Sequence, residues 1–413
     1  MVPCRRQQAE RPWLLGATRE PTHVDFGKNP SMAAPWGWTN WRAFADGSDA
    51  QSRVEMTLYS DCRFVGEIRG LGPYSVLNTI GASTTPRPGL RAPALVLRVE
   101  YHTAIDSVLD PGEPKTLVDA YHGGWVDDEL ASLLGLALGA RCRSGGLTRA
   151  WWGANSDPLG SPAEFEHRPP FLPPPEHERA PLLPNVAREV GLGAAHELLA
   201  TYPKLSEKDA SALVRAARLY QSALWIADGD PNLAWLQLVS ALESAAIRGS
   251  RDRRRHYERL SEAWPELAEV LSRAPDRVRD NASKMLADQV RVTNRVIAFV
   301  RQHQPPPPST RPSGWGRVDW DALPDLVHGV YRWRSRALHE GIPMPAPMCT
   351  PPSMIDDAPE EGAVSGGYGA AGASWTGSDI PLMLHTFAYA VRGSVLRWWQ
   401  SRVSGRTPPA LPA

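Results

Sequence analysis

The residues whose types and spacing best suit chemistry lie in the segment 330–341. Apolar residues recur there at near-helical spacing, and Gly341 and Pro343 follow where a helix must stop, so the pattern predicts the last turns of a helix. His339 would then occupy the final turn, where the partial negative charge of the helix end favours the imidazolium. That charge suits a proton donor, and it equally suits an ordinary helix cap.

A second helix is predicted upstream over residues 233–248, with Pro231 at its first turn. Glu243 directly follows Leu242 and falls at the edge of the apolar face of this helix. Such a position is compatible with a partly buried partner for an arginine, and also with a solvent-facing glutamate. Both interpretations remain open from the sequence.

The pattern Arg334-Ser335-x-x-x-His339, followed by glycine and downstream of the helix at 233–243, resembles the Apea-like branch of the HEPN superfamily. The resemblance covers roughly residues 204–403. Members of that family carry an R-x4-6-H motif on a helical bundle. Many of them are metal-independent ribonucleases of defence or toxin systems, and others are inactive binding modules.

This resemblance implies roles for individual residues. His339 would transfer protons, and Arg334 would clamp the phosphate, because a guanidinium stays charged and binds phosphate through two hydrogen bonds. Ser335 would orient His339 or the phosphate, while Arg332 and Arg336 would extend an anionic-ligand groove. The structural alternative is that Arg334 pairs with a carboxylate of the bundle and His339 caps the helix.

Helix geometry constrains these roles. At 100° per residue, Arg334 and His339 lie roughly 140° apart on a straight helix, so they do not share a face, whereas Ser335 and His339 do. Convergence of Arg334 and His339 therefore requires a distorted helix end or two copies of the chain. Family members commonly place the motif at a homodimer interface, so we expect a homodimer through the motif helix.

A second basic cluster spans residues 248–259 and holds six arginines. It contains another R-x4-H match, Arg251 to His256, but the surrounding turn is charged and lacks an apolar helix that would fix the geometry. We therefore do not expect Arg251 and His256 to be catalytic. The cluster is either solvated charge on a turn or a site for RNA phosphates, with Arg251, Arg254 and Arg255 as the contacts.

The sequence of the first part of the chain predicts a fold that differs from the helical bundle. After a loose arm over residues 1–30, we expect a mixed α/β N-terminal domain over 31–150. It would hold a helix at 130–138 and three β-branched or aromatic strands at 54–58, 63–68 and 94–101.

Residues 141–149 form a basic, glycine-containing stretch after that helix. It predicts either a solvated turn or a turn whose backbone amides hold an anion.

Proline dominates residues 151–185, which predicts an extended linker that adds no core. An all-α, antiparallel HEPN-like bundle is expected over 186–413. Within it, residues 342–378 are rich in Pro, Gly, Ser and Ala and predict a long mobile loop outside the core. The expected bundle helices are 206–224, 233–248, 276–302, 319–338 and 380–399.

Composition excludes several classes of protein. Lys+Arg and Asp+Glu both number 45, so contact with RNA must rest on local patches. Four scattered cysteines give no metal-ligand spacing, and we expect no metal and no cofactor. No apolar run approaches a signal peptide or a membrane span, so we expect a cytoplasmic protein without membrane contact. Arginine predominates over lysine, as in proteins of GC-rich bacteria.

Two functions of different class follow from the sequence and the resemblance. The first is a metal-independent RNA endonuclease of HEPN type, in bacterial defence or toxin-like growth arrest. The second is a catalytically inactive HEPN module that dimerises or binds a nucleotide, coupled to a sensing N-terminal domain.

Overall fold

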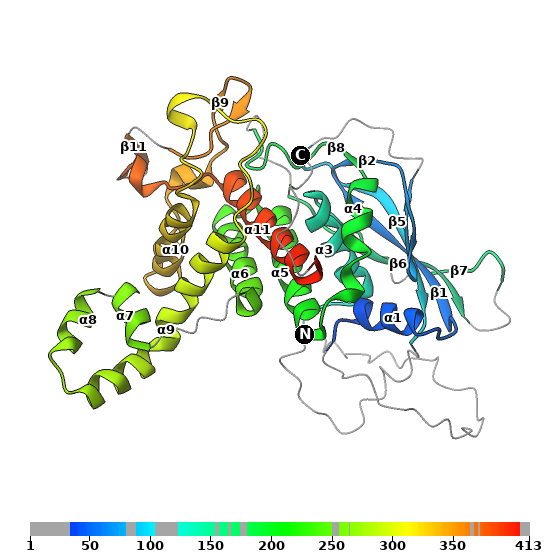
Figure 1. The fold of residues 1–413 in the computed structure, drawn as a ribbon. Coiled ribbons are helices and arrows are strands. Elements are labelled where there is room, and N and C mark those ends of the chain that lie inside the picture. Colours follow the sequence, from blue (N-terminus) through cyan, green and yellow to red (C-terminus); the bar gives the residue numbers. More distant parts are fainter. Residues whose placement is uncertain are drawn as a thin grey trace, which may run out of the picture. The chain divides into compact units, whose positions relative to one another are not determined.

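The computed structural model describes residues 34–79, 88–103, 123–152, 157–163, 167–173, 180–249, 256–263, 265–363, 367–370 and 372–404. The chain divides into two compact units, 1–31 and 32–413, and the described residues all belong to the second. The predicted arm over residues 1–30 lies outside the described residues. The described part of the chain is α+β, with helices and a six-stranded antiparallel sheet (Figure 1).

The sheet has the strand order β3-β4-β5-β1-β6-β7. In chain order these strands are β1 (Ser52–Ser60), β3 (Ile68–Leu71), β4 (Tyr74–Asn78), β5 (Ala92–Tyr101), β6 (Arg143–Trp152) and β7 (Ser161–Pro162). Alternate residues of β1 and β5 are buried, as expected when one face of a sheet covers a core. The predicted strands at 54–58 and 94–101 are therefore confirmed.

Two predictions for this region need correction. The expected strand at 63–68 is two strands, β3 and the short β2 (Arg63–Val65), and β2 pairs in parallel with β8 (Glu189–Gly191). The expected basic turn at 141–149 is wrong, because residues 143–152 form β6 between β1 and β7. Ladder pairing with β1 runs along this backbone, and β7 pairs with residues 149 and 150 on the other side, so the segment is a strand and not a turn.

Helix α3 (Val126–Leu138) packs on the sheet and holds α1 (Trp36–Ala45). The buried carboxylate of Glu129 in α3 accepts hydrogen bonds from the backbone N–H groups of Trp36 (2.8 Å) and Gly37 (2.6 Å). These two amides at the start of α1 have no partner within their own helix, and Glu129 satisfies them.

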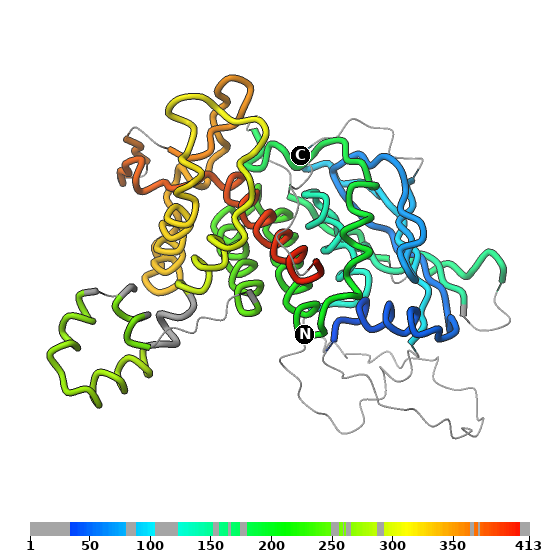
Figure 2. Tube along the Cα trace, in the orientation of Figure 1, coloured from blue at the N-terminus to red at the C-terminus, as the bar shows by residue number. Residues whose placement is uncertain are grey.

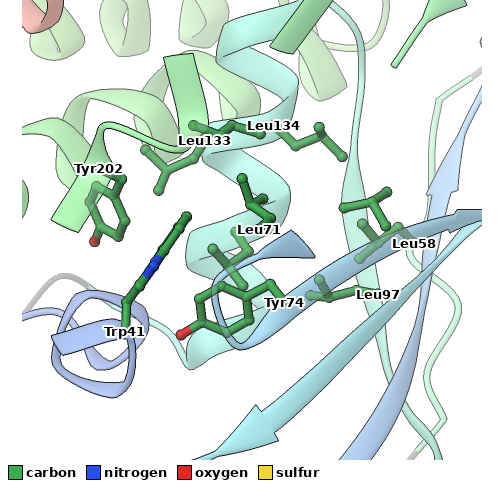
Figure 3. A pocket seen from close by; sticks show the side chains of 11 residues that line it. Trp41, Leu58, Leu71, Tyr74, Leu97, Leu133, Leu134 and Tyr202 are labelled. Atoms are coloured by element: carbon green, nitrogen blue, oxygen red, sulfur yellow. The ribbon is translucent and has the colours of Figure 1, made fainter. Parts of the chain in front are cut away.

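An apolar cavity of about 10 Å³ lies where α1, the sheet and α3 meet, beside the 3-10 helix η3 (Tyr202–Lys204). Figure 3 shows Trp41, Tyr74, Leu133 and Tyr202 around it. The space is comparable to that of one water molecule, and its walls are almost entirely hydrocarbon. It is a packing defect of the core and too small for a ligand.

The helical part follows along the chain. Its helices are α4 (Gly193–Leu199), α5 (Glu207–Ile226), α6 (Pro231–Gly249), α7 (His256–Ala263), α8 (Pro265–Ser272), α9 (Asp276–Gln302), α10 (Leu323–His339) and α11 (Leu384–Ser404), with the 3-10 turn η4 at Gly314–Gly316. The predicted start of α5 is confirmed, because the Ser206 hydroxyl accepts a hydrogen bond from the backbone N–H of Asp209. The short helices α7 and α8 pack beside α9 (Figure 1).

Sheet and helices share one core. Buried apolar residues from β1, β5 and α3 belong to the same cluster as those of α5, α6, α10 and α11. Arg392 of α11 also donates hydrogen bonds to the carbonyl oxygens of Leu136 and Ala137 at the end of α3. Figure 2 traces α11, in red, beside α5 and α6.

The proline-rich segment 151–185 contributes to packing where it is described. Leu183 belongs to the shared core, Leu172 is buried against Tyr59 and Trp225, and β7 extends the sheet. The prediction that this segment adds no core is therefore wrong. Apolar side chains spaced among the prolines are buried in the described parts of this segment.

The segment 342–378 also packs against the helices, contrary to its composition. Met344 and Met348 are buried, and the indole N–H of Trp235 donates to the carbonyl oxygen of Met348 at 3.0 Å. Arg311 forms a bidentate ion pair with the buried carboxylate of Glu361, which lies in this segment before α11. The segment forms the 3-10 turns η5 (Ala346–Cys349) and η6 (Gly377–Asp379) and the strands β9 (Met354–Ile355), β10 (Ala358–Pro359), β11 (Gly367–Ala370) and β12 (Ala373–Thr376).

These short hairpins mean that the region 186–413 is not all-α. The prediction that residues 342–378 lie outside the core is wrong for its described residues. Individual anchors, two methionines and one buried carboxylate, override a composition that is otherwise typical of a loop.

A buried arginine joins the sheet to the helices. The guanidinium of Arg141, 1% exposed, donates to Asp61 after β1 (2.5 Å), to Asp228 after α5 (3.0 Å) and to the carbonyl oxygen of Leu224 (2.7 Å). Both carboxylates are as buried as the arginine. None of the three charged groups is open to water, so the charge of each must be balanced by the other two.

We predict that Arg141→Met lowers the free energy of unfolding by about 3–5 kcal/mol, because it leaves two buried carboxylates without their cation. Urea denaturation measures the loss. The difference in free energy of unfolding between Arg141→Met and the parent should become smaller as the pH is lowered, because protonation of the unpaired buried carboxylates removes their charge. The matched control is Arg53→Met, which removes an exposed arginine of β1 and should change stability by less than about 1 kcal/mol. Equal losses in both variants would contradict the assignment.

A second prediction concerns His385, which fastens the segment 342–378 to α11. Its Nε2 lies 2.8 Å from the carbonyl oxygen of Glu360, and burial lowers the pKa of His385 to about 4 from an ordinary 6.5, against the opposing effects of that hydrogen bond and of Glu361. The folded protein thus binds fewer protons than the unfolded chain between these values. The stability that His385 contributes is complete above pH 6.5 and is lost as the pH falls towards 4.

We expect His385→Gln to remove on the order of 2 kcal/mol of the stability difference between neutral pH and about pH 4. Urea denaturation over that pH range provides the measurement. His328→Gln, which removes an exposed imidazole of α10, serves as the control. An unchanged pH profile in His385→Gln would show that the buried histidine is not the group that titrates.

Candidate functional site

Helix α10 ends as its sequence predicts. Pro324 stands in its first turn, and Gly341, with φ of 70°, follows the C-cap residue Glu340. The backbone N–H of Ile342 returns to the carbonyl oxygen of Arg336 at 3.4 Å. Gly341 adopts the left-handed conformation that ends many helices, and a residue with a Cβ would be strained there. His339 is consequently fixed as the last residue of α10.

The sequence-predicted residues of α10 separate onto two faces. One face is exposed and carries Arg332, Ser335, Arg336 and His339, which follow each other at i, i+3, i+4 and i+7. We call these four residues the exposed stripe. The opposite face carries Arg334 and packs towards α6. Ser335 and His339 thus share a face as predicted, while Arg334 and His339 do not.

Arg334 is held by a carboxylate. Its Nη2 atom lies 3.2 Å from Oε1 of Glu243 in α6 and 3.3 Å from Oε2, and the two side chains are 23% and 19% exposed. The hydroxyl of Tyr331, one turn earlier in α10, donates to the same carboxylate. Glu243 is therefore the arginine partner that the sequence left open, and Arg334 has the structural contact proposed as its alternative.

The electrostatics of this cluster keep Tyr331 protonated. Burial raises the pKa of Tyr331 well above its usual range, and the hydrogen bond to Glu243 and the negative charge of Glu243 raise it further. Nearby Arg334 and Arg295 of α9 act in the opposite direction. A protonated tyrosine and an ionised glutamate form a strong, charge-assisted hydrogen bond. The cluster is suited to fixing α10 against α6.

Around the exposed stripe, η6 supplies a counter-charge. The pKa of Asp379 is lowered, first by hydrogen bonds from Thr376 and then by the positive charges of Arg332 and Arg336. Its carbonyl oxygen accepts a hydrogen bond of 2.7 Å from the indole N–H of Trp333. The turn η6, at the end of the segment 342–378, thus borders the stripe.

Arg336 is also positioned by its own helix. Its guanidinium carbon lies 4.6 Å from the centre of the Trp333 ring, and its Nε lies 3.5 Å from Glu340. An arginine stacked on an indole keeps one guanidinium edge open to a ligand.

His339 and Ser335 are exposed, and within the described part of the chain neither side chain has a hydrogen-bond partner. Within the described residues, no side-chain hydrogen bond therefore supports the capping role considered for His339. An unpartnered imidazole at the surface is available to a ligand.

The second basic cluster is only partly described. Arg251, Arg254 and Arg255 lie outside the described residues, while His256 begins α7 and is exposed. Arg248, at the end of α6, is paired with Asp209 at 3.0 Å.

Three neighbours of the site were missed from the sequence: Tyr331, Arg295 and Asp379. Tyr331 had a usable signal, because it precedes Arg334 by three residues and so shares its helix face. Arg295 and Asp379 come from other elements, and only the fold brings them close.

No group of three His, Cys, Asp or Glu side chains gathers in the described residues as a metal site would require. Among the described helices, none combines the length and apolar character of a membrane span. Comparison with protein-family models, with curated proteins and with solved structures finds no match for this chain.

We predict that Arg334→Met destabilises the protein by about 1–2 kcal/mol, because it leaves the partly buried Glu243 with Tyr331 as its remaining partner. Arg332→Met removes an exposed arginine of the same helix and should stay within about 0.5 kcal/mol of the parent. Thermal and urea unfolding of the two variants provide the comparison. Similar stability of both would mean that the Glu243 contact does not hold α10 in place.

Proposed function

We propose that this chain is a metal-independent RNA endonuclease of HEPN type that acts through the exposed stripe of α10. The observation that carries the proposal is the stripe itself, in which two guanidiniums, a hydroxyl and an unpartnered imidazole lie on one solvent-facing side of a helix. Guanidiniums bind phosphates, and an imidazole transfers protons near neutral pH. The resemblance of the R-x4-H motif to HEPN ribonucleases supports the same conclusion.

In this proposal the 2′-hydroxyl of the RNA attacks the adjacent phosphorus and loses its proton to a base. The bond from phosphorus to the 5′-oxygen breaks, and that oxygen gains a proton from an acid, which leaves a 2′,3′-cyclic phosphate and a 5′-hydroxyl. His339 transfers the protons, and Ser335 orients His339 or the phosphate. Arg332 and Arg336 stabilise the charge that develops on the phosphate oxygens.

Arg334 takes a different role in this arrangement. Because its guanidinium faces Glu243 on the far side of α10, we assign it as a positioning residue that fixes the stripe. Direct clamping of phosphate by Arg334 requires it to leave Glu243.

A homodimer fits this chemistry. The reaction needs both a base and an acid, and one copy offers one imidazole at the reacting position. His328 shares the exposed side of the helix but lies eleven residues away, about 16 Å along the axis. Two copies meeting through α10 would bring two His339 side chains to one phosphate.

The alternative is a catalytically inactive HEPN module that binds a partner or a nucleotide. The specific observation in its favour is the pairing of Arg334 with Glu243, which neutralises the motif arginine. Cleavage by the purified chain distinguishes the two functions.

We predict that the purified full chain, in excess chelator, cleaves labelled single-stranded RNA or transfer RNA to products with 2′,3′-cyclic phosphate ends. His339→Ala should lower the rate by about 100-fold or more, since proton transfer by a positioned side chain contributes about that much. Arg332→Ala and Arg336→Ala should each weaken cleavage and make it less dependent on salt concentration, because each variant makes one phosphate contact fewer. Arg334→Ala should reduce the rate together with the stability.

His256→Ala is the matched control, because it removes the histidine of the other R-x4-H match and should leave cleavage unchanged. Circular dichroism shows whether each variant is folded. Cleavage that persists in His339→Ala, or that requires a divalent metal, contradicts the proposed mechanism. Binding of RNA without cleavage by any form of the chain supports the inactive module.

A further inference from the structure

A polar recess lies far along the chain from the motif, between α3, the start of β6 and α5. Its volume is about 50 Å³, whereas one water molecule requires about 10–15 Å³. The recess therefore has room for a small group of several heavy atoms. Its walls include the side chains of Arg143, Arg218, Asp128, Ser132, Ser144 and Ser222.

The recess carries an excess of positive charge. Arg143 comes from β6 and Arg218 from α5, and burial and the nearby Arg218 lower the pKa of Arg143 while Asp128 raises it. Asp128 is the one carboxylate on the walls, and its Oδ2 lies 3.8 Å from Nη1 of Arg218. Two guanidiniums thus face one partly exposed carboxylate.

Neither arginine is satisfied by its surroundings. Nη2 of Arg218 donates to the carbonyl oxygen of Gly123, but its buried Nη1 has no hydrogen-bond partner. Arg143 lies over the ring of Trp225, with 5.6 Å between guanidinium carbon and ring centre, and no described residue accepts a hydrogen bond from its guanidinium. Unused donors on two neighbouring cations are what an oxyanion needs.

The backbone is shaped to hold Arg218 at this position. A Cβ at Gly124 would lie 1.7 Å from Nη1 of Arg218, so only glycine allows the guanidinium to pack there. The other nearby carboxylate, that of Asp127, is buried and accepts a hydrogen bond of 2.5 Å from Ser144, a residue of the recess wall. Both arginines therefore stand at the recess in the folded chain.

We propose that this recess binds a phosphate group, either inorganic phosphate or the terminal group of a phosphate monoester. Arg143 and Arg218 hold the oxygens, and Ser222 lies on the wall as a further donor. Although burial acts on the guanidinium of Arg143, the residue still exposes part of its surface, so the remainder of an ester can extend into solvent beside it. The site involves no residue of α10 and does not depend on the proposed ribonuclease activity.

The sequence pointed to this stretch for another reason. The segment 141–149 was predicted to hold an anion on turn amides or to be a solvated turn, and it is a strand. The strand nevertheless delivers the side chain of Arg143 to the recess, so the anion is bound by side chains and not by the backbone.

Isothermal titration calorimetry of the full chain with inorganic phosphate tests the proposal, at an ionic strength held constant with sodium chloride. We expect saturable binding in the parent protein and a loss of about tenfold or more in affinity in Arg143→Gln, which removes one charged donor. Asp128→Asn, which keeps the side-chain shape and removes the opposing charge, should bind more tightly. A purely structural role of these residues predicts no such gain.

Arg53→Gln removes one positive charge from an exposed position of β1 and is the matched control, expected to bind like the parent. Glycerol phosphate forms the second arm, and tighter binding than inorganic phosphate identifies a monoester as the ligand. Absence of binding by both compounds at millimolar concentration overturns the proposal. Equal affinity in the parent and in Arg143→Gln overturns it as well.

Discussion

The buried guanidinium of Arg141 is the contact on which the junction of sheet and helices depends. It bonds to the residue after β1, to the last turn of α5 and to the turn that follows α5. The carbonyl oxygen of Arg141 itself accepts a hydrogen bond from Ser60. Because such a group is costly to bury unpaired, the elements that supply its partners must come together in one arrangement. The position of α5, and of α6 packed against it, follows from this constraint.

A second carboxylate and arginine pair continues this arrangement towards the candidate site. Glu243 of α6 holds Tyr331 and Arg334 of α10, which sets the rotation of α10 about its axis. With that face fixed inward, helical spacing places Arg332, Ser335, Arg336 and His339 outward together. The motif therefore has two parts: Tyr331 and Arg334 hold α10 against α6, and the exposed stripe faces solvent. Sequence spacing alone shows that these parts lie on different faces and does not show which one is inward.

The sequence predicted best where one strong local signal determined the outcome. The bounds of α9 at 276–302 and the end of α10 just before Gly341 follow from apolar periodicity and from a glycine that must be left-handed. Predictions based on composition were weaker. Residues 143–152 contain glycine and arginine and still form a strand of the sheet, because β1 offers a paired partner that no local pattern reveals. Likewise, Met348 and Glu361 anchor a segment rich in Pro and Gly through contacts with Trp235 and Arg311.

A neutral chain can still present local positive surfaces when its arginines differ in their partners. Arg141 and Arg311 are neutralised by buried carboxylates, and Arg334 by a partly buried one. Arg143 and Arg218 share a single acidic neighbour across the recess, and Arg332 and Arg336 share the charge of Asp379 beside the stripe. Net charge therefore says little about anion binding in this protein. What matters is which guanidinium donors the fold leaves unpaired, as it does with Nη1 of Arg218 at the recess.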